Sequence, residues 1–173
     1  YAGAVGNTVL ALNRPGTAAP RVAVTGSVLT VNDTDEDGDA LSAVAESVTS
    51  TGGGTATIYS DGTFTFLPGV GDKGIIDTFV YRVSDGQATG SGTVSVTIGA
   101  ELVWWVDGAA APGGDGRSTL PLSGLATLNG NPATDPDAPG ETIFLRTGPG
   151  AYAGGLALEA SQSLVGDSAG LSI

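Results

Sequence analysis

Three residue types that carry much of protein chemistry are missing from this sequence. It contains no Cys, no His and no Met. Without Cys and His there can be no disulfide, no thiolate or imidazole zinc site, and no Ser-His-Asp or Cys-His nucleophile. No apolar run approaches the roughly 18 residues that a membrane-spanning helix requires, so membrane insertion is not expected for this segment.

Positive charge is also scarce. The chain has 6 Lys and Arg residues against 18 Asp and Glu residues, which gives a net charge of −12 at pH 7. The only lysine is Lys73. Such a surface repels nucleic acids and anionic membranes and attracts cations, so we expect no nucleic-acid partner.

What the sequence has in abundance is glycine. Its 29 Gly residues show no Gly-X-Y period and stand among many Ala, Thr, Ser and Val residues. This composition is typical of short strands joined by tight turns, and long stretches with helical periodicity are absent. The sequence therefore predicts an all-β protein.

Residues 1–99 predict one domain, an immunoglobulin-like β-sandwich. Seven short strands separated by turn residues fit that fold, and the turn Ser60-Asp61-Gly62 predicts a hairpin. Aromatic residues such as Phe64, Phe66 and Tyr81 are expected in the core. The predicted strands are 7–12, 26–31, 41–48, two within 55–67, 77–86 and 92–98.

Several phrases of this region stand in an order that is known from one family. "VNDTDEDGDALSAV", "GGGTATIYSDGTFTFLP", "DTFVYRVSDG" and "GTVSVTI" resemble the cadherin-like, VCBS-type repeat of large bacterial surface proteins, over about residues 5–99. The resemblance implies an extracellular Ig-like module that often binds calcium through its Asp-rich loop. Residues 13–24 depart from it, because they are longer than the usual connection between the first two strands.

Residues 100–173 differ in sequence pattern from residues 1–99 and predict a second domain. The phrase "VWWVDGAAAPGGDGRS" and the later pattern G-Y-GG-L-L-Q-L-G resemble the N-terminal cap and first coil of right-handed parallel β-helix proteins. That group includes surface proteins and polysaccharide-cleaving enzymes. Strands are expected near Ile143, Leu156, Leu164 and Leu171. An apolar plug over the end of the solenoid is expected from Leu120, Leu122, Leu125 and Leu128.

The densest chemical signal is a run of carboxylates between Asp33 and Asp39. The spacing D-x-D-x-D-G matches the start of a calcium loop, but Val44 stands where an EF-hand requires Glu, and no helices flank the loop. In a sandwich, loops 60–62 and 85–91 lie at the same end as this one. The candidate calcium ligands are Asp33, Asp35, Asp37, Asp39, Asp61 and Asp85. The alternative is a solvated acidic turn without metal.

Other polar candidates are weaker. Asp135 and Asp137 could form a catalytic pair, although Asp-Pro is ordinary turn chemistry. Arg146 could point toward an acidic sugar, although a plain surface role is the simpler interpretation. Trp104 and Trp105 are neighbours on one strand and must face opposite sides, one toward the second domain and one toward the first. An exposed Trp could stack on a sugar.

These observations favour a non-catalytic, structural or adhesive segment of a bacterial protein at the extracellular cell surface. Two alternatives stay open, namely the N-terminal part of a β-helix polysaccharide lyase or hydrolase, and a subunit of a self-assembling extracellular filament. Expected partners are neighbouring domains, other copies of the chain, or glycans. Apolar residues at the end of the chain are expected to need a cover. They are Leu156, Leu158, Leu164, Val165, Leu171 and Ile173.

Overall fold

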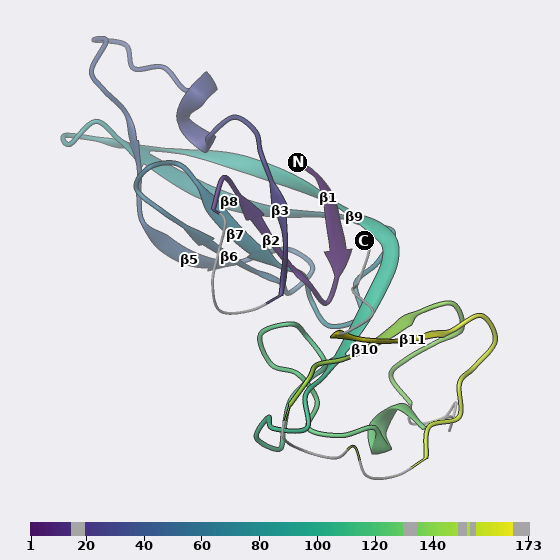
Figure 1. The fold of residues 1–173 in the computed structure, drawn as a ribbon. Helices are drawn as coiled ribbons and strands as arrows, with labels where there is room; N and C mark the ends of the chain where they lie inside the picture. The colour runs from purple at the N-terminus through teal and green to yellow at the C-terminus, as the bar shows by residue number, and fades with distance from the viewer. Residues whose placement is uncertain (15–19, 130–134, 149–151, 153–154, 168–173) are drawn as a thin grey trace.

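The computed structural model describes residues 1–14, 20–129, 135–148, 152 and 155–167 (Figure 1). The described residues form strands and two short 3₁₀ helices, η1 (Leu29–Asn32) and η2 (Ala126–Leu128), with no α-helix among them, so the all-β prediction is confirmed. Among these residues we find no helix with the length and apolarity needed to cross a lipid bilayer. The strands are β1 (Ala2–Gly6), β2 (Val9–Leu12), β3 (Arg21–Val24), β4 (Ser42–Ala43), β5 (Glu46–Thr49), β6 (Thr55–Ile58), β7 (Phe64–Leu67), β8 (Ile76–Ser84), β9 (Thr89–Val106), β10 (Thr142–Leu145) and β11 (Ser163–Gly166).

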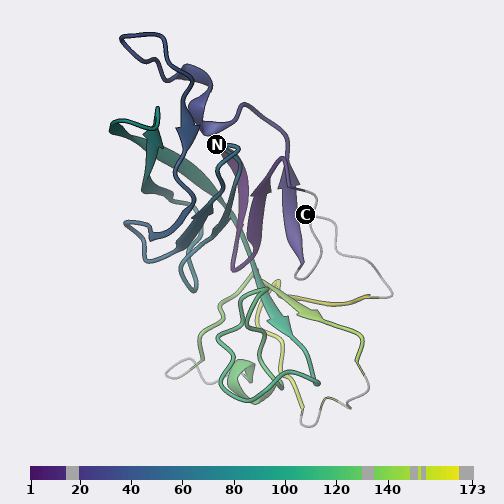
Figure 2. The same cartoon turned by 90° about the vertical axis from the view of Figure 1, so that its left-hand side faces the viewer.

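The first part of the chain is a sandwich of two sheets (Figure 2). One sheet has the order β3-β2-β7-β6-β5, and the other contains β9, β8 and β4, with β1 paired to β9. Alternate residues of β7 and β8 point between the sheets, which buries Phe64, Phe66, Phe79 and Tyr81 as predicted. The rings of Phe66 and Phe79 stack with centroids 5.9 Å apart. Apolar alternation on two facing strands therefore builds the core.

Two predicted strands in this region were wrong in detail. Residues 26–31 contain η1 instead of a strand, because the place beside β2 is taken by β3 from the long connection 13–24. Leu29 is buried in the core while Val31 is 65% exposed. Leu29 therefore anchors this segment to the core, and the segment does not bury a whole apolar face as a strand would. The predicted strand 41–48 is divided between the sheets, with β4 paired to β8 and β5 paired to β6.

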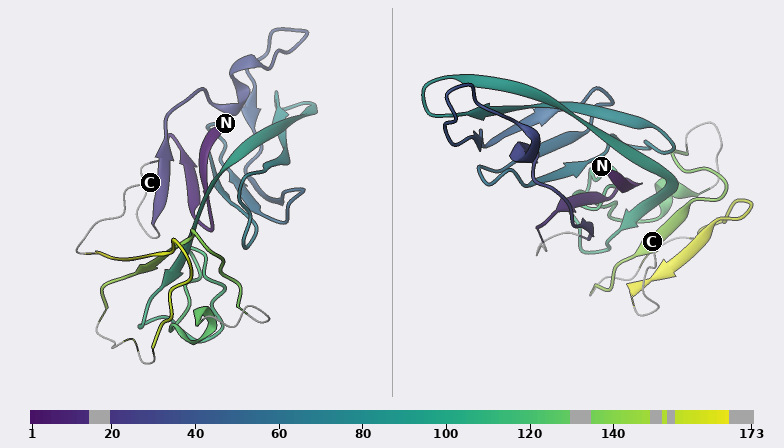
Figure 3. Two further views of the ribbon diagram at one scale, coloured as in Figure 1. Left: turned by 90° about the vertical axis from the view of Figure 1, so that its right-hand side faces the viewer. Right: turned by 90° about the horizontal axis from the view of Figure 1, so that it is seen from above.

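Strand β9 is the longest element and continues through the predicted domain boundary near residue 100. It pairs antiparallel with β8 over Thr89–Thr97 and parallel with β10 over Val103–Val106. Between these two stretches β1 lies beside it in parallel, with register shifts where the ribbon bends (Figures 1 and 3). One strand is thus shared by the sandwich and the second part of the chain.

The second part of the chain is built on a stack of parallel strands. β9, β10 and β11 pair in register, with Trp104 beside Ile143 and Ile143 beside Leu164. The strands predicted near Ile143 and Leu164 are confirmed, whereas residues 155–160 around Leu156 form no strand and Leu171 lies outside the described residues. The described residues do not close into a solenoid coil.

Three of the four leucines predicted to form an apolar plug are buried together, while the solenoid end that they were expected to cover stays a prediction. Leu122, Leu125 and Leu128 are buried in one cluster with Trp104 and Ile143, while Leu120 is 48% exposed. The clustering follows from the turn at 123–125 and from η2, which bring the three leucines to the same face. Leu128 is fully buried, so this cluster is the core of the second part of the chain.

A separate apolar cluster joins the two parts, and we call it the joint. It contains Val5, Val103, Trp105 and Phe144, with the Trp105 and Phe144 rings 4.8 Å apart. Trp104 points to the opposite side of β9, so the predicted division of the two tryptophans is confirmed. Their exposed fractions are 2% and 3%, which rules out an exposed tryptophan for stacking on sugar.

Buried polar groups hold the joint as well. The Trp105 indole N–H donates to Thr8 Oγ1 at 3.1 Å, and the Ser118 backbone N–H donates to the Asn7 carbonyl at 2.8 Å. Glu141 is 5% exposed, accepts from the Trp104 indole at 2.6 Å, and forms an ion pair with Lys73. These contacts satisfy groups that would otherwise be costly to bury.

Candidate metal centre

Two loops meet at the end of the sandwich away from the joint. One follows η1 and carries the acidic run 33–39, and the other is the turn between β8 and β9 that begins at Asp85. Short β4 pairs with the end of β8, which draws the end of the acidic loop toward that turn. The sandwich therefore places carboxylates from distant parts of the sequence at one end.

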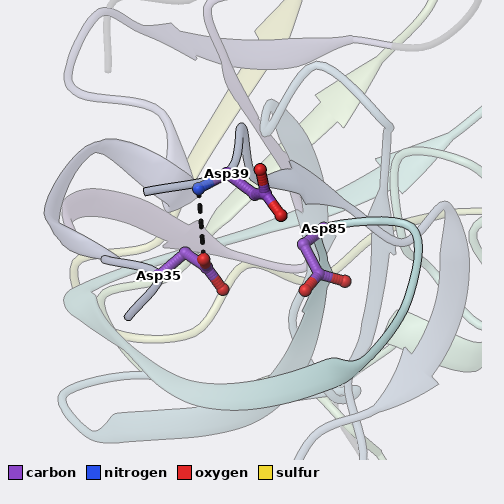
Figure 4. Close-up of side chains that lie close together, drawn as sticks. All are labelled: Asp35, Asp39 and Asp85. Atoms are coloured by element: carbon purple, nitrogen blue, oxygen red, sulfur yellow. Dashed lines mark hydrogen bonds between the residues drawn. The ribbon is translucent and has the colours of Figure 1, made fainter. Parts of the chain in front are cut away.

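Three carboxylates converge there. Ligand oxygens of Asp35, Asp39 and Asp85 all lie within 4.8 Å of one another (Figure 4). Asp35 and Asp85 border an open groove of about 450 Å³ that also includes Asp33 and Leu41. Three of the six predicted ligands are thus brought together, from both of the loops that supply them.

Backbone N–H groups fix the orientation of two of these carboxylates. Asp35 Oδ1 accepts from the N–H groups of Asp37 and Asp39 at 3.0 and 3.1 Å, and Gly38 turns the loop with a φ of +80°, which glycine adopts without strain. Asp85 Oδ1 accepts from Gln87 and Ala88, both at 2.6 Å. Hydrogen bonds from the backbone of Ala88 and Gln87 hold the pKa of Asp85 below its usual value.

Asp33, another predicted ligand, is not among the three converging carboxylates and is held by a core tyrosine. The Tyr81 hydroxyl lies 3.0 and 2.9 Å from its two carboxylate oxygens and donates to them. Burial and this hydrogen bond raise the pKa of Tyr81 to about 12, so the phenol stays protonated. Gly92 leaves room for the ring, because a Cβ there would lie 2.5 Å from Tyr81 Cε1. Asp33 thereby anchors the acidic loop to the core.

The other two predicted ligands stand apart from the cluster. Asp61 forms an ion pair with Arg14 at 3.2 Å and accepts from the Thr63 hydroxyl at 2.6 Å. The Thr63 side-chain and backbone hydrogen bonds lower the pKa of Asp61. Asp37 is exposed in the same loop as Asp35 and does not join the three converging carboxylates. Neither residue is positioned as a ligand in this arrangement.

The donor set suits a hard divalent cation. Calcium takes carboxylate and carbonyl oxygens, and three carboxylates without a cationic neighbour repel one another. Among the described ion pairs, none involves Asp35, Asp39 or Asp85. A bound Ca²⁺ at these oxygens would offset that repulsion, so the residues present fit the metal.

The weaker candidates have structural partners. Asp137 is 7% exposed and accepts from the Gln162 side chain at 2.6 Å. Burial, with nearby Asp135 as a further cause, raises the pKa of Asp137 to about 6. Arg146 pairs with Asp107 at 3.3 Å, which agrees with the simple interpretation of this residue. The groove at the acidic end is lined by none of these residues.

Sequence reasoning missed the contribution of Tyr81 and Gly92 to this site. The sequence predicts Tyr81 in the core, where its ring does lie, but its hydroxyl reaches the acidic loop. The usable signal was the register of β8 and β9, which sets Tyr81 opposite Gly92. A tyrosine beside a cross-strand glycine has space to extend its hydroxyl beyond the core.

Comparison with known proteins concerns the region that contains these loops. No curated protein and no solved structure matched the chain. The family model of the bacterial cadherin-like domain matches residues 7–100, which include β2 to most of β9 and all three converging carboxylates. Because that match spans more than half of the sequence, the chain belongs to the bacterial cadherin-like domain family.

Proposed function

We propose that the chain is a non-catalytic, structural or adhesive segment of an extracellular bacterial surface protein, and that calcium stiffens its acidic end. Family membership supports an extracellular structural role. The single observation that carries the calcium proposal is the convergence of Asp35, Asp39 and Asp85 from two loops. A cation held by both loops would restrict their motion relative to each other.

Calcium titration tests this proposal. We expect calorimetry on the metal-stripped chain to show binding with a dissociation constant of roughly 10⁻⁴–10⁻³ M, the range of extracellular modules. Asp85→Asn removes the only converging carboxylate of the β8–β9 turn, and we expect it to weaken binding about tenfold, or ~1.4 kcal/mol. Asp85 supplies a charge that the acidic loop cannot replace.

Asp37→Asn is the matched control, because it also removes one negative charge, from the acidic loop that carries Asp35 and Asp39, without touching the three converging oxygens. The affinity of this variant for calcium should stay within about twofold of the parent, since the exposed Asp37 carboxylate supplies no converging oxygen and interactions between exposed charges are weak, about 0–1 kcal/mol. Equal losses in Asp37→Asn and Asp85→Asn would show nonspecific attraction to an acidic surface. Absence of any binding would leave the loop as a solvated turn.

For the second part of the chain we propose the base of a parallel β-solenoid. The in-register stack β9-β10-β11 supports this, and among the described residues β11 is an edge strand with Leu158 and Leu164 nearly half exposed. Pairing of a further strand with β11, from the same polypeptide or a second copy, would cover them. Leu171 and Ile173 of this predicted surface lie outside the described residues.

Light scattering and hydrogen exchange test the open edge. We expect the isolated chain to associate as concentration rises, and amides of Ser163–Gly166 to gain protection on association, because edge N–H groups then find partners. A strict monomer whose β11 amides are already strongly protected would contradict the proposal. That the chain is not itself an enzyme stays a prediction, which cleavage of an acidic glycan by the pure chain would overturn.

A further inference from the structure

The first strand of the chain and the last strand of the sandwich run in the same direction. β1 pairs with β9 through Ala2 beside Thr97, Ala4 beside Ile98 and Gly6 beside Leu102. The pairing extends to the first residue, because the Tyr1 amino group donates to the Ser95 carbonyl at 2.7 Å and the Thr97 N–H donates to the Tyr1 carbonyl at 2.8 Å. The start of β1 and the end of β9 therefore lie at opposite ends of one paired segment (Figure 1).

We propose that β1 and β9 form a mechanical clamp that resists tension applied along the chain. A pull on the start of β1 and on the chain after Val106 would slide the strands lengthwise past each other, because they are parallel. All the bonds between them are then loaded together. Each hydrogen bond contributes only about 0.5–1.5 kcal/mol net. The force needed to separate the strands is therefore high only when all the bonds must break together, and not one after another.

Side chains of β1 strengthen the clamp on both faces. Ala4 is 1% exposed in the sandwich core, and Val5 is 7% exposed in the joint beside Trp105 and Phe144. Successive residues of a strand point to opposite faces, so β1 is inserted between two apolar clusters. Lengthwise sliding of β1 would have to extract both side chains at once.

The turn after β1 transfers the tension into the second part of the chain. Thr8 is fully buried and accepts from the Trp105 indole, and Asn7 accepts from the Ser118 backbone. The Val9 N–H donates to Ser118 Oγ at 3.2 Å. Tension that enters at Tyr1 thus passes to β9 and to residue 118 without crossing strands β2 to β8.

The contacts between β1 and β9 described above use none of Asp35, Asp39 and Asp85, so the clamp does not need calcium. The clamp proposal rests on the proposed structural role only in assuming that the chain bears tension. The geometry of the clamp does not depend on the metal. Measuring unfolding forces both with calcium and with EDTA therefore separates the two proposals.

Single-molecule pulling in two directions tests the clamp, and the lack of native Cys allows unique attachment points. The sliding geometry uses a cysteine added before Tyr1 and Ala111→Cys in the exposed loop after β9. The peeling geometry keeps the first point and uses Gln87→Cys at the exposed tip of the β8–β9 hairpin. There the pull on Tyr1 is directed toward the end of β1, which opens the bonds one after another.

We expect the sliding geometry to require a severalfold higher unfolding force than the peeling geometry, in EDTA as in calcium. Forced unfolding follows the unfolding barrier, so Val5→Ala should lower the sliding force while Val80→Ala, at a 52% exposed position on β8, leaves it unchanged. Equal forces in the two directions would overturn the clamp. A sliding force that collapses in EDTA would also overturn it and assign the resistance to the calcium centre.

Discussion

Replacement of Trp105 by alanine should lower the free energy of unfolding by about 3–5 kcal/mol, the range for large aromatic truncations in a core. Trp105 is 3% exposed, packs on Phe144 and Val5, and donates its indole N–H to Thr8. A loss of this size is a large part of a typical stability of about 5–15 kcal/mol. Denaturant unfolding followed by circular dichroism measures it.

The same experiment reports whether the joint couples the two parts of the chain. Because Trp105 contacts both β1 and β10, we expect a single transition whose midpoint moves as a whole. Val80→Ala, at a position that is 52% exposed, should change stability by no more than about 0.5 kcal/mol. Two separate transitions, with only one of them shifted by Trp105→Ala, would show that the parts unfold independently.

Replacement of Asp77 by alanine should lower the free energy of unfolding by about 3 kcal/mol, because it leaves one buried donor and three partly buried donors without their acceptor. Asp77 is 1% exposed and accepts from the Thr51 hydroxyl at 2.8 Å and from the Gly52 and Thr78 N–H groups, both at 2.7 Å. Ser50 also donates to it. These bonds tie the turn after β5 to the start of β8. Thermal or denaturant unfolding at pH 7 measures the loss.

The lowered pKa of Asp77 should make the free energy of unfolding depend on pH. Burial alone would raise its pKa, but the hydrogen bonds from Ser50, Gly52, Thr51 and Thr78 outweigh burial and lower it. A carboxyl whose pKa is lowered on folding contributes stability above its unfolded pKa of ~3.9 and loses that stability as pH falls through the folded value. The neighbouring Asp72 has its pKa raised by burial and by Asp77, so its contribution has the opposite sign.

Asp77→Asn is the matched variant for this dependence, since it keeps the shape and removes the charge. It should be less stable than the parent at pH 7, and the gap should narrow as pH falls below about 4. A gap that stays constant from pH 7 to pH 3 would show that the ionised form of Asp77 brings no stability.

Much of the sandwich could be predicted because its signals are local. Buried and more exposed residues alternate strictly along β7 and β8. The turn residues Ser60-Asp61-Gly62 predict the hairpin that joins β6 to β7. Residues 26–31 carry the same kind of apolar pattern, yet η1 forms there because tertiary pairing gives the strand position to β3. The periodicity of a segment does not predict which of two apolar segments pairs with a neighbouring strand.

The acidic centre was predictable in part for the same reason. The order of strands and loops predicts that Asp35, Asp39 and Asp85 come together. It does not predict the side-chain partners of the other carboxylates, since Tyr81 donates a hydrogen bond to Asp33 and Arg14 forms an ion pair with Asp61. For the joint, the sequence predicted only that one of the two adjacent tryptophans faces the first domain, and its polar contacts had no sequence signal. Asn7, Thr8 and Ser118 are small polar residues that usually lie at the surface, and only their pairing across the joint explains their burial.

Strand β9 also sets the order in which the chain can fold. Tyr1 meets Ser95 across a sequence separation of 94 residues, so β1 has no partner on that side until β9 has been made. Closing so long a loop is slow compared with forming the hairpin of β8 and β9. The second part of the chain then assembles on residues 103–106 as its first strand, which makes the sandwich a template and β10 and β11 late additions to it.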